Sequence, residues 1–324
     1  MTPADSLGWA WVGHLLDGGR TPWAQFDGAP AAPRLGVFPG AAQLELARRV
    51  NEAGARPTVV RRILTTGAPF RGQQEFLVRG VAEVRDYGPV PVDPAEVPRQ
   101  ELVRVGVGAL AEELASRVPP PARPRRPRPW DRFRGSGVLA LPLAPVDHLL
   151  YDAWAARARR GRVLAWRRWT VRLARTDRVP EPLQFERRAQ RWLATGFRRR
   201  VEVTPEASGR PVAADSVELV RQVHMLLGGL LAPDERDRLA QQLLSPWLGQ
   251  RIGDRRLRLP DEVRAWATTL GERIAEDVRR AGYPVRGNLA TLTQLDTAAP
   301  QRPPLDDVLA ATVHVLGKGW ENES

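Results

Sequence analysis

The sequence from residue 137 to residue 160 reads GVLALPLAPVDHLLYDAWAARARR, and this stretch decides the fold class. Its first part, residues 137–143, is a short apolar run bounded by glycine and proline, which indicates a buried strand. In its second part, residues 146–160, Leu150 and Trp154 lie four residues apart and therefore share one face of a helix. A strand followed directly by an amphipathic helix predicts an α/β element.

Helical periodicity dominates the rest of the chain. Apolar residues recur at helical spacing at about 41–53, 58–65, 98–116, 166 onward, 183–195, 216–227, 234–244, 261–281 and 305–317. The helix at 261–281 starts after Pro260 and stops at Gly282. Strand signals are few: residues 200–204 alternate in polarity, and residues 75–87 could form a strand pair. The sequence therefore predicts an α/β fold that is predominantly α-helical with a small sheet.

A proline-rich stretch divides the chain. It reads VPPPARPRRPRP from Val118 onward, and prolines at this density interrupt helices and sheets and favour an extended polyproline II spacer. The sequence therefore predicts a helical or mixed N-terminal half at residues 1–118, a Pro/Arg-rich linker at 119–129 and an α/β C-terminal half at 130–324.

The two halves carry similar helices in the same order. Residues 43–51 (QLELARRVN) resemble residues 216–224 (SVELVRQVH), and residues 101–110 resemble residues 307–316. The halves are thus either two unequal related repeats or unrelated segments whose amphipathic helices are similar by chance.

Composition restricts the class of protein. The 324 residues are 43% hydrophobic, which is a globular proportion, and they include no cysteine. The lack of cysteine excludes disulfides, thiolate metal sites and a cysteine nucleophile. No apolar run reaches the roughly 18 residues of a membrane helix, and the N-terminus lacks the basic region of a secretory signal. We therefore expect a cytoplasmic protein without a membrane span, and no motif calls for a cofactor.

Positive charge is concentrated in one region. The whole chain carries +12, whereas residues 121–200 contain 21 arginines and six acidic residues, a net charge of +15. Only one basic residue of the chain is lysine, an arginine bias typical of a GC-rich genome. Tryptophans are interleaved with the arginines of this region. Either the arginines bind a polyanion through phosphate forks, or they are solvated and internally paired while the tryptophans form the core.

Eight arginines of this region are the candidate anion-binding residues. They are Arg123, Arg125, Arg126, Arg128, Arg157, Arg160, Arg167 and Arg168. No helix-turn-helix, zinc-finger or other nucleic-acid-recognition signature accompanies them.

Asp147 and His148 are the candidate catalytic residues. They follow the predicted strand, and loops at the carboxyl ends of strands often hold active sites in α/β folds. Asp147 is also a natural N-cap for the next helix, which is the structural alternative. His14, His224 and His314 have no second ligand at a spacing typical of a metal site, so no metal site is predicted.

Three stretches of the second half resemble the sulfotransferase-like proteins of actinobacteria. They are AWAARARRG at residues 153–161 with the tryptophans that follow, ELVRQV at residues 218–223, and residues 257–289, which contain LRLPDEVRAW and AGYPVRGNL. Together with their surroundings these patterns cover about half of the chain.

The resemblance implies a P-loop fold that binds the sulfonate donor PAPS through a Gly-rich loop with a lysine. In such a loop, backbone N–H groups at a helix N-terminus and the lysine hold the phosphate. This sequence has no such loop, its one lysine is Lys318, and the strand at residues 137–143 is not followed by the arginine that holds the 3′-phosphate. The resemblance therefore implies a relative that has lost its donor site.

Three functions stay open at this point. The first is a non-catalytic sulfotransferase-like protein that acts by binding, with a protein or a polyanion as its unidentified partner. The second is a transferase with an unorthodox site for an anionic donor. The third is a polyanion-binding or nucleic-acid-binding module that uses the arginine-rich region 121–200.

Overall fold

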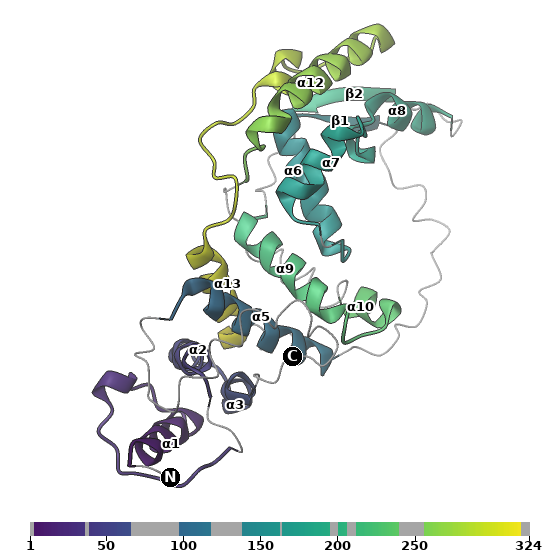
Figure 1. Ribbon diagram of the computed structural model, residues 1–324. Helices are drawn as coiled ribbons and strands as arrows, with labels where there is room; N and C mark the ends of the chain where they lie inside the picture. The colour runs from purple at the N-terminus through teal and green to yellow at the C-terminus, as the bar shows by residue number, and fades with distance from the viewer. Residues whose placement is uncertain are drawn as a thin grey trace. The chain divides into compact units, whose positions relative to one another are not determined.

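The computed structural model describes residues 3–35, 39–65, 97–117, 138–162, 164–194, 200–205, 212–239 and 256–318. Within these ranges lie 11 α-helices and one parallel sheet of two strands, so the predicted fold class is confirmed (Figure 1). The α-helices are α1 (Pro3–Leu16), α2 (Ala41–Glu52), α3 (Pro57–Thr65), α5 (Arg99–Ala115), α6 (Val146–Arg159), α7 (Trp166–Arg175), α8 (Phe185–Leu193), α9 (Ala214–Leu227), α10 (Pro233–Leu239), α12 (Asp261–Ala281) and α13 (Leu305–Lys318). The strands are β1 (Val138–Leu143) and β2 (Arg200–Pro205), and the 3-10 helices are η1 (Trp23–Gln25), η4 (Glu181–Leu183) and η6 (Leu289–Thr293).

Most of these helices lie where the apolar periodicity predicted them. α12 follows Pro260 and ends at Gly282, whose φ of 67° is the left-handed conformation that glycine adopts without a steric penalty. α1 was not among the predicted helices, and two glycines, Gly8 and Gly13, interrupt its apolar run. Burial of Trp11 and Leu15 outweighs the low helix propensity of those glycines. The predicted strand pair at 75–87, the linker at 119–129 and the end of the helix predicted at 234–244 lie outside the described residues.

Packing divides the chain into two compact units. Unit 1 combines residues 1–118, 222–236 and 304–324, and unit 2 combines residues 119–221 and 237–303. Residues 222–236 and 304–324 were expected in the C-terminal half. They contain the end of α9 and all of α13, and they belong to the same unit as the first 118 residues. Long-range packing, which linear order does not reveal, decides this assignment.

Unit 1 is a helical unit in which α13 packs against both α5 and α2. Gly106 of α5 permits this close approach. A Cβ atom at Gly106 would lie 2.6 Å from Cγ2 of Thr312 on α13, which is closer than real Cβ atoms come to a neighbour. The two helices whose sequences resemble each other, α5 and α13, therefore contact each other directly.

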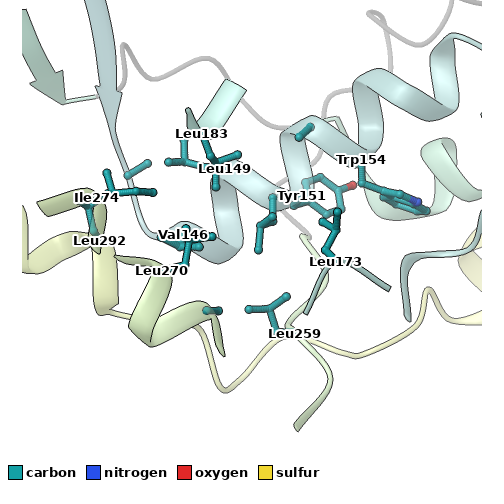
Figure 2. Close-up of a cluster of buried hydrophobic side chains, with 14 of the residues drawn as sticks. Val146, Leu149, Tyr151, Trp154, Leu173, Leu183, Leu259, Leu270, Ile274 and Leu292 are labelled. Atoms are coloured by element: carbon teal, nitrogen blue, oxygen red, sulfur yellow. The ribbon is translucent and has the colours of Figure 1, made fainter. Parts of the chain in front are cut away.

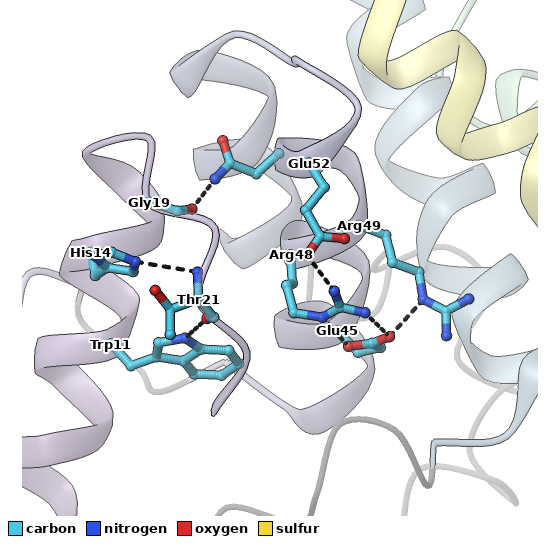
Figure 3. A network of polar contacts seen from close by, with 9 residues as sticks. Trp11, His14, Gly19, Thr21, Glu45, Arg48, Arg49 and Glu52 are labelled. Atoms are coloured by element: carbon cyan, nitrogen blue, oxygen red, sulfur yellow. Dashed lines mark hydrogen bonds and ion pairs between the residues drawn. The ribbon is translucent and has the colours of Figure 1, made fainter. Parts of the chain in front are cut away.

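A buried carboxylate organises the polar side of α2 (Figure 3). The Glu45 side chain is 2% exposed and accepts hydrogen bonds from Arg48 at 2.8 Å and from Arg49 at 2.6 Å. These two guanidinium groups outweigh the effect of burial and hold the pKa of Glu45 below its ordinary value. Glu218 and Arg221 of α9 form the matching ion pair three residues apart, at the positions that the sequence comparison aligned.

Unit 2 contains the sheet. β1 and β2 pair in parallel from Val138 opposite Arg200 to Leu143 opposite Pro205. Parallel strands need a crossover connection, and α6, α7 and α8 supply it in the sequence. Side chains from α6, α7 and α12 converge in the hydrophobic core beside the sheet (Figure 2).

The last turn of α8 departs from the expected burial. Its shared apolar face predicts that Trp192 is buried along with Phe185 and Ala189. Phe185 and Ala189 are buried, but Trp192 is only partly buried and the side chain of Leu193 is 44% exposed. The prediction for Trp192 is therefore wrong in degree, because the end of α8 extends beyond the core that covers its first turns.

Candidate anion-binding surface

Asp147 lies in the first turn of α6, where its carboxylate accepts hydrogen bonds from two backbone N–H groups. Its carboxylate is buried and accepts the backbone N–H of His148 at 2.9 Å and the backbone N–H of Asp296 at 2.7 Å. The residue at the N-cap is Pro145 instead of Asp147, because the chain is still extended at residue 145. Asp147 therefore joins the start of α6 to the segment after η6.

His148 has a different neighbour from Asp147. Its Nδ1 atom lies 3.5 Å from a guanidinium nitrogen of Arg256, and another nitrogen of Arg256 lies 3.7 Å from the Asp152 carboxylate. The two predicted catalytic residues are adjacent in sequence, but their side chains contact different partners.

The connection from β1 to α6 does not have the form of a phosphate-binding loop. It consists of two residues, Ala144 and Pro145. Proline has no N–H to donate, and the carboxylate of Asp147 already accepts the N–H of His148 at the start of the helix. The start of α6 therefore holds an internal carboxylate, and the connection after β1 offers no run of N–H groups to a phosphate.

The C-terminal end of α6 brings two arginines together. Gly161 has a φ of 72°, and the N–H of Arg162 donates to the carbonyl of Arg157 at 3.0 Å. The N–H of Gly161 donates to the carbonyl of Ala158 at 3.0 Å, which completes a Schellman motif. The motif turns the chain back so that Arg157 and Arg162 lie at the same helix end.

α7 ends in the same motif, with Asp177 in place of glycine. Asp177 has a φ of 43°, and the N–H of Arg178 donates to the carbonyl of Leu173 at 3.0 Å. The Asp177 carboxylate is turned toward α12, where it accepts hydrogen bonds from the Trp266 indole at 2.9 Å and from Arg273 at 3.0 and 3.1 Å. Arg178 thus occupies the position at the end of α7 that Arg162 occupies at the end of α6.

Four guanidinium groups gather at these helix ends. Arg157 lies over the ring of Trp169, 5.8 Å from the centroid. Partial burial, followed by repulsion from Arg162, Arg178 and Arg172, lowers the pKa of Arg157 from its ordinary value. We call these four residues, Arg157, Arg162, Arg172 and Arg178, the Arg157 cluster.

The Arg157 cluster lacks acidic partners in the part of the chain that the structure describes, where none of its members forms an ion pair. The carbonyl ends of α6 and α7 offer only a partial negative charge to neighbouring cations. Other arginines of the region are paired, since Arg167 contacts Glu262 at 2.9 Å. A net positive surface therefore remains at the helix ends.

The eight arginines predicted from the sequence have different surroundings. Arg157 belongs to the cluster, Arg160 at the C-cap of α6 and Arg168 on α7 are exposed, and Arg167 forms an ion pair. The other four, Arg123, Arg125, Arg126 and Arg128, lie outside the described residues. Sequence reasoning did not single out Arg162, Arg172 and Arg178, although the regional excess of positive charge included them.

The neighbouring tryptophans belong to the core. Trp154, Trp166 and Trp169 are 1%, 3% and 4% exposed, and their rings pack against one another. The indole N–H of Trp154 donates to the carbonyl of Leu164, and that of Trp166 donates to the carbonyl of Arg258. The interpretation that these tryptophans are core residues is therefore correct for the three.

The described residues form neither a metal-binding cluster nor a membrane-spanning helix. These residues contain no group of three or more histidine, aspartate and glutamate side chains arranged to hold a metal ion. None of the described helices combines the length and the apolar character needed to cross a membrane. Comparison with protein-family models, with curated proteins and with solved structures finds no match to this chain.

Proposed function

We propose that this chain acts by binding polyanions, and that the Arg157 cluster is the binding site. The observation that carries the proposal is the gathering of four guanidinium groups that form no ion pair within the described residues. Guanidinium groups form bidentate hydrogen bonds with phosphate, sulfate and carboxylate oxygens. A ligand with several such anionic groups would relieve the mutual repulsion of the cluster.

The alternative is that the arginines are simply solvated. Exposed arginines are common, and a helix C-terminus stabilises a nearby cation by about 0.3–1 kcal/mol without any ligand. Two features favour a binding site over this alternative. The cations come from two helices and from the turns that follow them, and partial burial followed by repulsion from the other three lowers the pKa of Arg157.

The sulfotransferase-like resemblance forms part of this proposal. A non-catalytic relative would keep the general affinity for anions while losing the specific loop after β1. The anion would then be held at the C-terminal ends of α6 and α7 by side chains alone.

Binding of fluorescein-labelled heparin to the full chain tests the proposal. Fluorescence anisotropy should show binding at low salt that weakens steeply as salt rises, because each contact releases counterions. With about four contacts, the affinity should fall roughly 100-fold between about 50 and 200 mM salt.

A matched pair of triple variants separates a local site from total charge. R162Q/R172Q/R178Q removes three members of the Arg157 cluster. R20Q/R61Q/R302Q removes the same charge from exposed positions elsewhere. We expect the first variant to lose at least 10-fold in affinity and the second to lose about 2-fold. Equal losses, or no binding by the unmodified chain at low salt, would show that the proposed site does not exist.

A further inference from the structure

A row of arginines on α7 extends the Arg157 cluster. Arg168, Arg172 and Arg175 are spaced four and three residues apart, so they share one helix face, and all three are exposed. At 1.5 Å per residue the row is about 10 Å long. The ten residues of α7, WRRWTVRLAR, contain four arginines and no acidic or amide side chain. This face of α7 thus carries a row of positive charges and no acidic or amide side chain that could recognise a ligand by hydrogen bonding.

Among the described residues, no tryptophan is exposed enough to serve as a platform on which bases could stack. Proteins that bind single strands use exposed aromatic rings, and each stacked base contributes about 1–3 kcal/mol. Here Trp166 and Trp169 of α7 are buried, and Arg157 covers the ring of Trp169. The indole of Trp266 is half-buried, and its N–H donates a hydrogen bond to Asp177.

A surface that binds through charge alone favours the ligand with the highest charge density. A DNA duplex carries one phosphate for about every 1.7 Å of its axis, twice the density of one of its strands. Each phosphate contact also contributes more counterion release on a duplex, about 0.9 against 0.7 for a single strand. Contacts to phosphates hold a protein on a duplex without reading its sequence.

We propose that the Arg157 cluster and the arginine row of α7 bind the phosphate backbone of double-stranded nucleic acid without sequence preference. This inference rests on the proposed function and narrows its ligand from polyanions in general to a duplex. The arginines at the ends of α6 and α7 provide the contacts. Because Trp166 and Trp169 are buried, they offer a single strand no base stacking.

Anisotropy measurements with the full chain test the inference. The probes are a labelled duplex of roughly 20 base pairs, a single strand with the same number of phosphates, and a second duplex of unrelated sequence. We expect the duplex to bind several-fold more tightly than the single strand at low salt. The two duplexes should agree within about 2-fold, since no base is read.

Three variants locate the binding. R168Q/R172Q/R175Q should weaken duplex binding at least 10-fold, whereas R20Q/R61Q/R302Q should weaken it about 2-fold. Trp266→Phe should leave duplex and single-strand binding within about 2-fold of the unmodified chain. Tryptophan fluorescence confirms that each variant remains folded, because the buried indoles of unit 2 report on its core.

The outcomes distinguish this inference from the proposed function. A single strand that binds as tightly as the duplex, or a loss of single-strand binding in Trp266→Phe, would overturn the inference alone. Binding of heparin without binding of the duplex would do the same. Sequence-selective binding that persists at high salt would also overturn it. Absence of binding to heparin and to both forms of DNA would overturn the proposed function as well.

Discussion

The ion pair between Asp177 and Arg273 allows a quantitative prediction. Asp177 ends α7 and contacts α12 through both Trp266 and Arg273. These hydrogen bonds, Arg273 first, lower the pKa of Asp177 to about 2 from its ordinary 3.8. Replacement by asparagine removes the charge but keeps a residue that tolerates the left-handed backbone at φ 43°. D177N therefore isolates the charge from the backbone conformation.

The size of the effect follows from the pKa and from exposure. A change from 3.8 to about 2 corresponds nominally to ~2.5 kcal/mol, at about 1.4 kcal/mol for each tenfold change in proton affinity. The Asp177 side chain is 60% exposed, so solvent and salt screen much of this energy. Exposed ion pairs contribute about 0.2–1 kcal/mol in double-mutant cycles. We expect D177N to lower the free energy of unfolding by about 1 kcal/mol near pH 7.

The pH dependence has a definite sign. The folded-state pKa lies below the unfolded-state value, so the unfolded chain binds the proton more tightly. The stabilisation is therefore fully present above about pH 5 and is lost as the pH falls from about 4 toward 2. Urea unfolding followed by tryptophan fluorescence should show the difference between the unmodified chain and D177N shrinking over this range.

A double-mutant cycle with R273Q supplies the control. The loss in the double variant should be smaller than the sum of the two single losses, because the two residues share one interaction. A difference between D177N and the unmodified chain that stays constant from about pH 7 to pH 3 would refute the assignment of the lowered pKa to this ion pair.

Three further predictions concern packing and buried polar groups. Gly106→Ala should destabilise unit 1 by about 1–3 kcal/mol in thermal unfolding, because its methyl group would overlap Thr312, and Thr312→Ala in the same chain should restore part of the loss. Glu45→Gln should cost about 2 kcal/mol in urea unfolding, because two guanidinium groups lose their charged partner; no loss would show that solvent screens the pair completely. Tyr151→Phe should cost about 1 kcal/mol, because it leaves the carbonyl of Val212 without this 2.7 Å hydrogen bond; an increase in stability would contradict the assigned contact.

The positions of most helices and of β1 were accessible to sequence reasoning because their signals are local. In α12 the apolar spacing, the preceding proline and the left-handed glycine all lie within the helix or next to it. The helix α1 was not predicted; its glycines argue against a helix locally, whereas burial of its tryptophans against the rest of unit 1 favours one. Propensity is a weak signal that tertiary packing overrides.

The candidate site was only partly predictable. The excess of arginine over acidic residues in the region 121–200 identified the region but not the residues. Arg167 and Arg168 are neighbours in sequence, yet Arg167 pairs with Glu262, 95 residues away, and Arg168 does not. Which arginine finds an acidic partner depends on contacts with distant segments, and the sequence contains no local signal for such contacts.

The sequence by itself determined the helical periodicity, the short strand β1 and the sign and location of the excess charge, since each of these depends on residues close together in the chain. Tertiary structure alone decided that α13 packs against α5, that the Asp147 carboxylate binds the backbone at Asp296, and that Arg157, Arg162, Arg172 and Arg178 meet at two helix ends. The physical reason is that burial and electrostatic contacts act through space, so they join residues whose separation along the chain carries no information about their distance.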